Sequence, residues 1–303
     1  ALFLGAGNGV LRSRDGGANR RSALASWRMT TDWRITEVLD LVASPTVESG
    51  RGKGEEGRGN IQDSAGLIAA TAYGLWRTAD AGDTWERVPF PSRQPDATFT
   101  SAVVLDASQP GRWMIATAAG LFVSEDGGTS WQEVGPRVEV RALAQSPADP
   151  SRWLAGTAGH GALLSVDSGE TWEPVGDASA TLYAVAFDPH DPDCLAVGGY
   201  QMGVRLSPDG GSSWRPSSVD PQTTSVYTLA FDPRQPGRLW IGTMGDGRWA
   251  GNGSVTSSTC VKAGCGFSAK NARKRFSQSS KLRNKANDGV EPMAFIRLAS
   301  DTT

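Results

Sequence analysis

The sequence predicts an all-β protein, a β-propeller of about six four-stranded blades, with seven blades as the alternative. Three observations predict this fold. An eight-residue turn motif recurs at nearly constant spacing, a second turn marked by prolines recurs between its copies, and short apolar runs of strand length separate the turns. A repeat of roughly 40–45 residues is typical of a propeller blade built from four strands.

The first motif, called the Asp turn below, has the pattern Ser/Thr-x-Asp-x-Gly-x-Ser/Thr-Trp. Four copies occupy residues 78–85, 124–131, 165–172 and 207–214, and successive aspartates lie 46, 41 and 42 residues apart. A degenerate copy begins at Ser13, and its tryptophan is displaced to Trp27. Chemistry rarely needs five copies of one carboxylate, so we expect structural roles for Asp15, Asp80, Asp126, Asp167, Asp209, Trp85, Trp131, Trp172 and Trp214.

Each position of the Asp turn has a physical role. Apolar runs flank the motif, as at residues 120–123 and 131–134, so it connects two strands of a hairpin. The carboxylate can accept hydrogen bonds from backbone N–H groups two or three residues on. The glycine can adopt a positive φ. The tryptophan begins the next strand and covers the turn with apolar area.

This pattern resembles the Asp-box, also called the bacterial neuraminidase repeat, over roughly residues 1–250. Sialidases, xyloglucanases, sortilin-type receptors and photosystem II assembly factors share this repeat. The resemblance implies a propeller whose ligand site surrounds the central channel, on the face opposite the Asp turns. It also favours a secreted or extracytoplasmic protein, although the chain carries no targeting signal of its own.

The apolar runs divide into strands in blade order. Residues 1–28 supply the later strands of a first blade, and a Gly- and charge-rich stretch at 48–63 forms an exposed flexible insertion in the second. The strands expected after the first blade are 35–45, 67–71 and 75–78 in the second, 101–105, 140–144 and 182–187 opening the next three, and 226–231 and 239–243 in the sixth. The proline turns follow the opening strands at 106–110, 146–150, 188–192 and 232–236.

The composition changes near residue 250. Residues 251–303 hold nine basic and three acidic residues, a charge of +6, which leaves −8 on the first 250 residues. All 11 tryptophans lie in the first part. We expect residues 251–290 to be disordered. Residues 291–303 have two interpretations: a strand that supplies the missing inner strand of the first blade, or unrelated sequence that leaves the propeller incomplete.

Several functional classes are disfavoured. The total charge of −2 gives no sign of nucleic-acid binding, and no apolar run reaches the ~18–20 residues of a membrane helix. Cys194 is expected to be a lone thiol, and the C-x4-C pair of Cys260 and Cys265 lacks the four ligands of a zinc site. We therefore expect a monomer with no cofactor and no metal.

A ligand face is expected where the second-to-third turns of the blades and the loops between blades lie. For most of its residues a solvated loop position is the simpler interpretation. The candidates on this face are Asp32, Arg34, Tyr73, Arg93, Asp96, Arg137, Glu139, His160, Asp177, Tyr200, Asp220, Asp246 and Arg248.

Two functions follow from these candidates. The first is a non-catalytic binding or assembly scaffold that presents the ligand face to a protein or a carbohydrate. The alternative is a glycoside hydrolase of sialidase-like or xyloglucanase-like type, which needs an arginine cluster with a Tyr nucleophile, or two facing carboxylates ~5–10 Å apart. The sialidase Arg-Ile-Pro motif is absent, since the nearest string continues from Arg34-Ile35 to Thr36, and no carboxylate pair stands out as catalytic.

Overall fold

The computed structural model describes residues 1–13, 27–44, 66–90, 95–217 and 225–244. Across these ranges the protein is built from antiparallel sheets and one short helix, α2 (Pro95–Thr98), which confirms the all-β propeller class. The described chain divides into two compact units, the first ending at Leu143 and the second starting at Ala144. The expectations for Asp15, for the insertion at 48–63 and for residues 251–303 fall outside the described residues.

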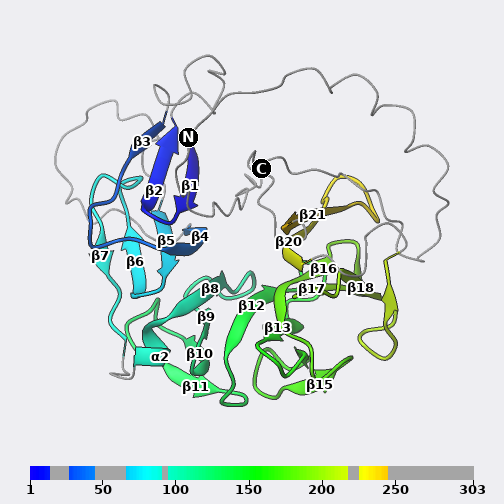
Figure 1. The fold of residues 1–303 in the computed structure, drawn as a ribbon. Helices are drawn as coiled ribbons and strands as arrows, with labels where there is room; N and C mark the ends of the chain where they lie inside the picture. Colours follow the sequence, from blue (N-terminus) through cyan, green and yellow to red (C-terminus); the bar gives the residue numbers. More distant parts are fainter. Residues whose placement is uncertain (14–26, 45–65, 91–94, 218–224, 245–303) are drawn as a thin grey trace, which may run out of the picture. The chain divides into compact units, whose positions relative to one another are not determined.

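The first unit holds three sheets whose strands are paired in chain order (Figure 1). Its first sheet has three strands among the described residues. The strands of this unit are β1 (Leu2–Ala6), β2 (Gly9–Ser13) and β3 (Trp27–Met29); β4 (Val38–Ser44), β5 (Gly66–Thr71), β6 (Gly74–Thr78) and β7 (Glu86–Arg87); and β8 (Thr100–Leu105), β9 (Trp113–Thr117), β10 (Gly120–Ser124) and β11 (Gln132–Val134).

The second unit continues the pattern from β12 (Val140–Gln145), the strand in which the division between the units falls. Within the described ranges its last sheet has two strands. The strands are β12, β13 (Trp153–Thr157), β14 (Ala162–Ser165) and β15 (Glu173–Val175); β16 (Leu182–Asp188), β17 (Asp191–Gly199), β18 (Val204–Ser207) and β19 (Arg215–Pro216); and β20 (Ser225–Phe231) and β21 (Leu239–Met244).

The core lies along the middle strands of the sheets. Every residue of β5, β9 and β13 is buried, whereas the outermost strands β7 and β15 are mostly exposed. Neighbouring sheets of one unit cover the middle strands from both sides: Ile68 of β5 and Ile115 of β9 share an apolar cluster in the first unit. Burial on both faces explains why these strands are almost continuously apolar.

The Asp turns make the same hydrogen bonds in each described copy. In the third blade the Ser124 hydroxyl donates to Asp126 Oδ1 at 2.8 Å and accepts from the Gly128 N–H at 2.8 Å. Asp126 accepts from the N–H and the hydroxyl of Ser130, at 2.8 and 2.6 Å. The recurring bond thus runs four residues on, further than the two or three that the sequence indicates. The same pattern recurs at Asp80, Asp167 and Asp209.

The proline turns are fixed by side chains at their first position. Asp106 is buried and accepts from the Ser108 N–H at 2.8 Å and from Arg112 Nη1 at 3.0 Å. Arg112 also donates to Glu125 at 2.8 Å, so the guanidinium joins the proline turn to the neighbouring Asp turn. A buried guanidinium with two carboxylate partners is well satisfied, and its role here is structural.

Four of the strands that open blades carry an irregularity that the sequence did not indicate. The pairing register shifts by one residue around Leu39, Ser101, Tyr183 and Tyr227, in β4, β8, β16 and β20. Such a bulge re-aims one side chain per strand. In the second unit two of these side chains, Tyr183 and Tyr227, stack with ring centroids 4.7 Å apart.

One expected boundary was wrong. The second blade's first strand was expected over 35–45, but β4 begins at Val38. Glu37 has φ of 52°, a left-handed conformation that an extended strand cannot include.

One hydrogen bond from β4 joins two blades of the first unit. Asp40 Oδ2 of β4 accepts from the backbone N–H of Val103 in β8, at 3.1 Å.

Candidate functional site

The second-to-third turns of three blades share a hydroxyl clasp, called the Thr turn below. In the second blade the Thr71 hydroxyl donates to the Gly74 carbonyl at 2.8 Å and accepts from the Tyr73 N–H at 3.0 Å. Thr117 in the third blade and Thr157 in the fourth make the same two kinds of bond. The residue whose N–H is held then differs from blade to blade: it is Tyr73, Ala119 or His160.

A pocket of about 440 Å³ lies in the second unit, between the fourth and fifth blades. One wall comes from β14, β15 and the following loop 176–181, and the other from β16, β17, β18 and the turn at 200–203. Two of the expected ligand-face residues, Asp177 and Tyr200, line it together. Its remaining lining residues are Ala162, Val175, Gly176, Ser179, Ala180, Thr181, Leu182, Val197, Met202, Arg205 and Trp214.

The pocket rim is held by backbone hydrogen bonds. The Gly161 N–H donates to the Ala180 carbonyl at 3.0 Å, and the Tyr200 N–H donates to the Thr181 carbonyl at 2.9 Å. The loop between the two blades is therefore tied to a turn on each side. A rim fixed in this way requires little reorganisation when a ligand enters.

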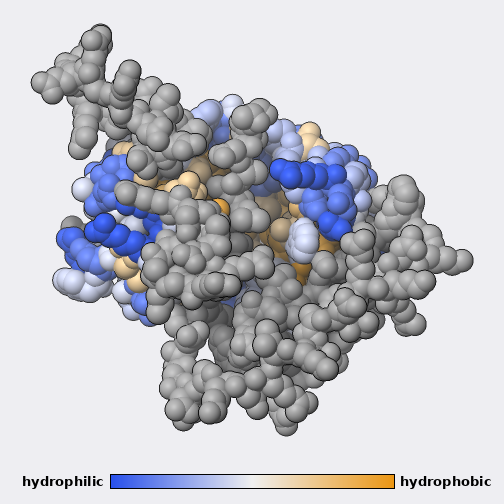
Figure 2. All heavy atoms as spheres, turned by 90° about the horizontal axis from the view of Figure 1, so that it is seen from above, coloured by the Kyte–Doolittle hydropathy of each residue, from blue (hydrophilic) through white to orange (hydrophobic). Residues whose placement is uncertain are grey.

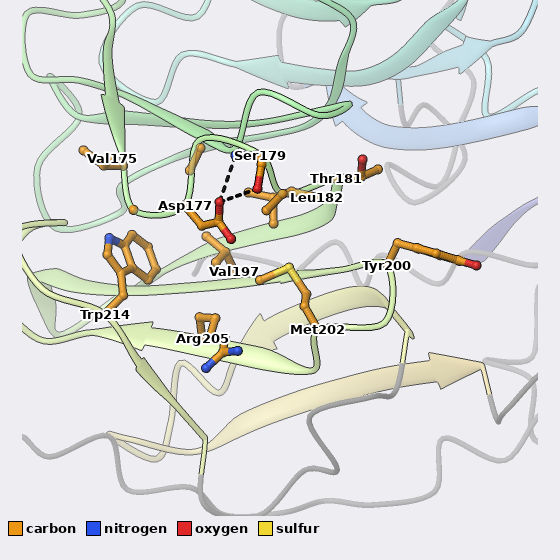
Figure 3. Close-up of a pocket in the computed structure, with 13 residues that line it drawn as sticks. Val175, Asp177, Ser179, Thr181, Leu182, Val197, Tyr200, Met202, Arg205 and Trp214 are labelled. Atoms are coloured by element: carbon orange, nitrogen blue, oxygen red, sulfur yellow. Dashed lines mark hydrogen bonds between the residues drawn. The ribbon is translucent and has the colours of Figure 1, made fainter.

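Asp177 caps its own loop. Its Oδ1 accepts from the N–H and the hydroxyl of Ser179, at 2.9 and 2.7 Å (Figure 3). These two bonds, aided by the nearby positive charge of Arg205, lower the pKa of Asp177 below its usual value. The carboxylate is consequently ionised at neutral pH.

Trp214 forms one end of the pocket. Its Nε1 donates to the Gly211 carbonyl at 3.0 Å, which leaves the ring as an apolar wall. Gly176 has φ of 76°, and a Cβ added there would lie 3.0 Å from Trp214 Nε1. The backbone therefore passes close to the indole. Figure 3 shows Tyr200 at the opposite end of the pocket, with Met202 and Arg205 between the two rings.

A second, shallower hollow of about 450 Å³ lies in the first unit. Trp33 and Tyr73 are its most exposed aromatic residues, at 84% and 53%. Arg34 lies beside them and is held by a bidentate ion pair with Asp32, with Nη2 to Oδ2 at 2.6 Å and Nε to Oδ1 at 3.1 Å. This pair lowers the pKa of Asp32 and raises that of Arg34. Trp76, Arg87 and Thr98 complete the lining.

The remaining expected residues do not join either cavity. Arg137 is paired with Glu133 at 2.6 Å, and Glu139 with Arg141 at 2.8 Å. His160 is exposed, with Nδ1 3.2 Å from the Ala158 carbonyl. Asp96 is exposed in α2. Four candidates lie outside the described residues: Arg93, Asp220, Asp246 and Arg248.

The sequence interpretation missed several lining residues. Trp33 was passed over because it stands alone in a loop, although an isolated tryptophan outside any strand run is a usable signal. Trp214 was assigned only to its Asp turn. Met202 and Arg205 follow Tyr200 by two and five residues and carry no local motif. Only the packing of two blades places them in one pocket.

Within the described residues, no three His, Cys, Asp or Glu side chains are grouped so that they could hold a metal ion. Cys194 is buried and forms no disulfide bond. No helix in the described ranges has the length and apolarity needed to cross a bilayer. The described surface visible in Figure 2 is largely hydrophilic, with smaller hydrophobic areas.

No protein-family model matches the chain, and neither does any curated protein. Solved structures do match. The chain is similar to an ancestral GH74 enzyme, with 19% identity and a TM-score of 0.54, over 68% of this chain and 27% of that one. The chain therefore spans less than a third of that enzyme's length.

Two further similarities have a comparable strength. YCF48 bound to D1 peptide has 19% identity and a TM-score of 0.51, over 80% of this chain and 70% of that one. The extracellular domain of BT4673, described as a one-component system of B. thetaiotaomicron, has 14% identity and a TM-score of 0.56, over 80% and 30%. At these identities the similarities show the fold, which enzymes and non-enzymatic proteins share.

Proposed function

We propose that this protein is a non-catalytic binding scaffold, and that the pocket of the second unit holds an apolar segment of a polypeptide partner. The observation that carries the proposal is the pocket's composition. Most of its lining residues are aliphatic or aromatic, and one guanidinium, Arg205, and one carboxylate, Asp177, supply its charge, so that polar and apolar atoms share its accessible surface about equally. Ligand pockets of proteins commonly combine an apolar wall with a few placed polar groups.

The apolar wall favours a polypeptide over a carbohydrate as the ligand. Val175 and the Trp214 ring, whose N–H is already bonded to Gly211, offer no hydrogen-bond partner for a sugar hydroxyl, and burying an unpaired hydroxyl costs about 1–3 kcal/mol. An apolar side chain in the same space gains roughly 25 cal/mol per Å² of buried apolar area. Asp177 and Arg205 can pair with the polar backbone groups on either side of such a side chain.

The chemistry of the carboxylates also supports binding over glycoside hydrolysis. A glycoside hydrolase needs a carboxylic acid that stays protonated near neutral pH, beside a second, ionised carboxylate. Asp32 and Asp177 have lowered pKa values because Arg34 and Ser179 hydrogen-bond to their charged forms. This is the reverse of the shift that a general acid requires. Neither Asp32 nor Asp177 therefore has the property of a general acid, which favours binding over hydrolysis at these two positions.

The proposal can be tested with a phage-displayed library of random peptides selected on the full chain. Selected peptides should bind Arg205→Gln and Met202→Ala about tenfold more weakly, since truncating a residue at the centre of an interface typically costs this much. His160→Ala, which alters an exposed residue outside the pocket in the same unit, is the matched control and should bind as the original chain does.

A panel of fluorogenic glycosides provides the opposing test. Turnover that disappears in Asp177→Asn would overturn the non-catalytic assignment. Selected peptides whose affinity is the same for the original chain, Arg205→Gln and Met202→Ala would show that the pocket is not the binding site.

A further inference from the structure

The hollow of the first unit displays aromatic rings that the proposed pocket does not use. Trp33 exposes 84% of its surface and Tyr73 exposes 53%, and both line one cavity with Trp76. Exposing this much aromatic area to water is unfavourable unless something covers it. A lone exposed tryptophan is unremarkable, but three aromatic residues that share a cavity form a stacking surface.

The polar groups around these rings are mainly hydrogen-bond donors. Arg87 donates from Nη2 to the Tyr73 carbonyl at 3.0 Å, which uses one of the five N–H donors of its guanidinium. The indole N–H of Trp76 is buried, so Trp76 contributes ring surface and no accessible donor to the hollow. The indole of Trp33 carries a further N–H and no acceptor nitrogen.

The carboxylate beside Arg34 is already engaged. Both carboxylate oxygens of Asp32 accept from Arg34, at distances from 2.6 to 3.1 Å. The carbonyl of Tyr73 accepts from Arg87, and Glu37 Oε1 lies 3.4 Å from the Tyr73 hydroxyl. A ligand that supplies acceptors therefore finds donors on Arg87 and Trp33, while Glu37 also presents a carboxylate near Tyr73.

We infer that this hollow binds a proline-rich segment of a partner protein in the polyproline II conformation. Pyrrolidine rings stack on aromatic faces, and the tertiary amide of proline supplies a carbonyl acceptor without an N–H donor. Aromatic-lined grooves recognise such segments because the extended helix is preformed and loses little entropy on binding. A sugar could also stack on Trp33, but each of its hydroxyls is a donor that would need an acceptor.

The charges at the hollow fit the same ligand. Asp32 neutralises Arg34 through the bidentate pair, and Glu37 and Arg87, both near Tyr73, carry opposite charges. An uncharged segment therefore meets no unbalanced charge. This site lies in the first unit and is separate from the pocket proposed above, so the two assignments stand or fall independently.

The test uses N-acetylated, C-amidated decaproline and the full chain, with binding measured by isothermal titration calorimetry. We expect decaproline to bind with an affinity that falls about tenfold in Trp33→Ala and in Tyr73→Ala. Trp240→Ala is the matched control, because Trp240 is also an exposed aromatic residue, at 38%, and lines neither of the two cavities. Its affinity for decaproline should be unchanged.

Two comparison ligands test whether the hollow prefers a proline-rich segment over another peptide or a sugar. A Gly-Ser decapeptide of equal length, which lacks pyrrolidine rings and retains N–H donors, should not bind measurably. Cellohexaose, a neutral sugar chain with flat ring faces, should bind at least tenfold more weakly than decaproline. Equal or tighter binding of cellohexaose that depends on Trp33, or no decaproline binding by a chain with unchanged circular dichroism, would overturn the inference.

Discussion

The Asp turns and the Thr turns both have to provide hydrogen-bond acceptors for the backbone N–H groups of a tight turn, and they do so in different ways. Both satisfy buried backbone groups with a small hydroxyl: Ser124 holds the Gly128 N–H, and Thr117 holds the Ala119 N–H. In the Asp turn a carboxylate also accepts from the hydroxyl at the start of the motif and from the N–H and hydroxyl four residues on, as at Asp126. The Thr turn closes with the hydroxyl alone and leaves the held residue free to vary. The difference shows how a repeated blade can keep the hydrogen bonds that hold its turns while the residue exposed at one turn varies.

The largest expected effect comes from the glycine of the Asp turn. Gly128 has φ of +84°, and an added Cβ would lie 2.6 Å from Trp113 Cζ3 and 2.9 Å from Val88 Cγ1. Gly128→Ala should lower the free energy of unfolding by about 3 kcal/mol, through overpacking and backbone strain together. Urea denaturation would measure this loss.

Gly127→Ala is the matched control for that clash. Gly127 also has a positive φ, of 68°, but the nearest atom to its added Cβ is 3.9 Å away. The cost should be only about 1 kcal/mol, the strain of the left-handed conformation. Ala81 and Ser168 already adopt that conformation at the equivalent position of other blades. Equal losses in the two variants would contradict the packing role of Gly128.

The second expected effect concerns the clasp of the Thr turn. Thr117 is fully buried, and its hydroxyl makes two hydrogen bonds, at 2.9 and 3.1 Å. Thr117→Val preserves the shape and removes both bonds, so the free energy of unfolding should fall by about 1–3 kcal/mol. Thermal denaturation followed by circular dichroism would detect it. A stability equal to that of the original chain would show that the clasp is dispensable.

The third effect is a pH dependence that belongs to the Asp turns. Their serine and threonine partners lower the pKa of Asp126 and of Asp167 from 3.8 to about 2. A lowered folded-state pKa stabilises the folded protein above the unfolded value and loses that contribution as pH falls toward the folded value. The melting temperature should therefore drop between about pH 4 and pH 2.

Asp126→Asn separates this contribution from general acid unfolding. The variant should melt at a lower temperature than the original chain at pH 7, and the difference should shrink toward pH 2. A difference that stays constant over this range would argue against the ionised carboxylate as the source of stability.

The smallest effect is expected at the variable position of the Thr turn. His160 is exposed, and its side chain contacts only the local Ala158 carbonyl among the interactions described above. His160→Ala should change the free energy of unfolding by less than about 0.5 kcal/mol. A larger loss would mean that the variable residue of the Thr turn also stabilises the fold. The Thr turn would then not differ from the Asp turn in this respect.

The sequence predicted the strands and the Asp turns well because these depend on local patterns. Alternation of apolar runs with turn residues places β9 and β10 without any tertiary information, and the spacing of Asp126 and Asp167 places the blades. The Thr turns also had a local signal, Thr-Ala followed closely by glycine at Thr71, which was hidden at the end of an apolar strand.

The cavities could not be predicted in the same way. Asp177 and Arg205 are far apart in sequence, and their approach depends on how two blades pack. Asp32 looked available as a functional carboxylate, although its partner Arg34 lies only two residues on. The sequence can indicate that a polar residue lies on the expected ligand face. Whether its side chain is available to a ligand depends on its neighbours in the folded chain, which the sequence does not show.

The bond between Asp40 and Val103 has a consequence for dynamics. Its acceptor belongs to the side chain of one blade and its donor to the backbone of the next. Breaking this bond, when the two blades separate or Asp40 turns away, should therefore expose the Val103 amide proton to exchange with solvent. In a hydrogen-exchange experiment this amide should exchange faster in Asp40→Ala than in the original chain.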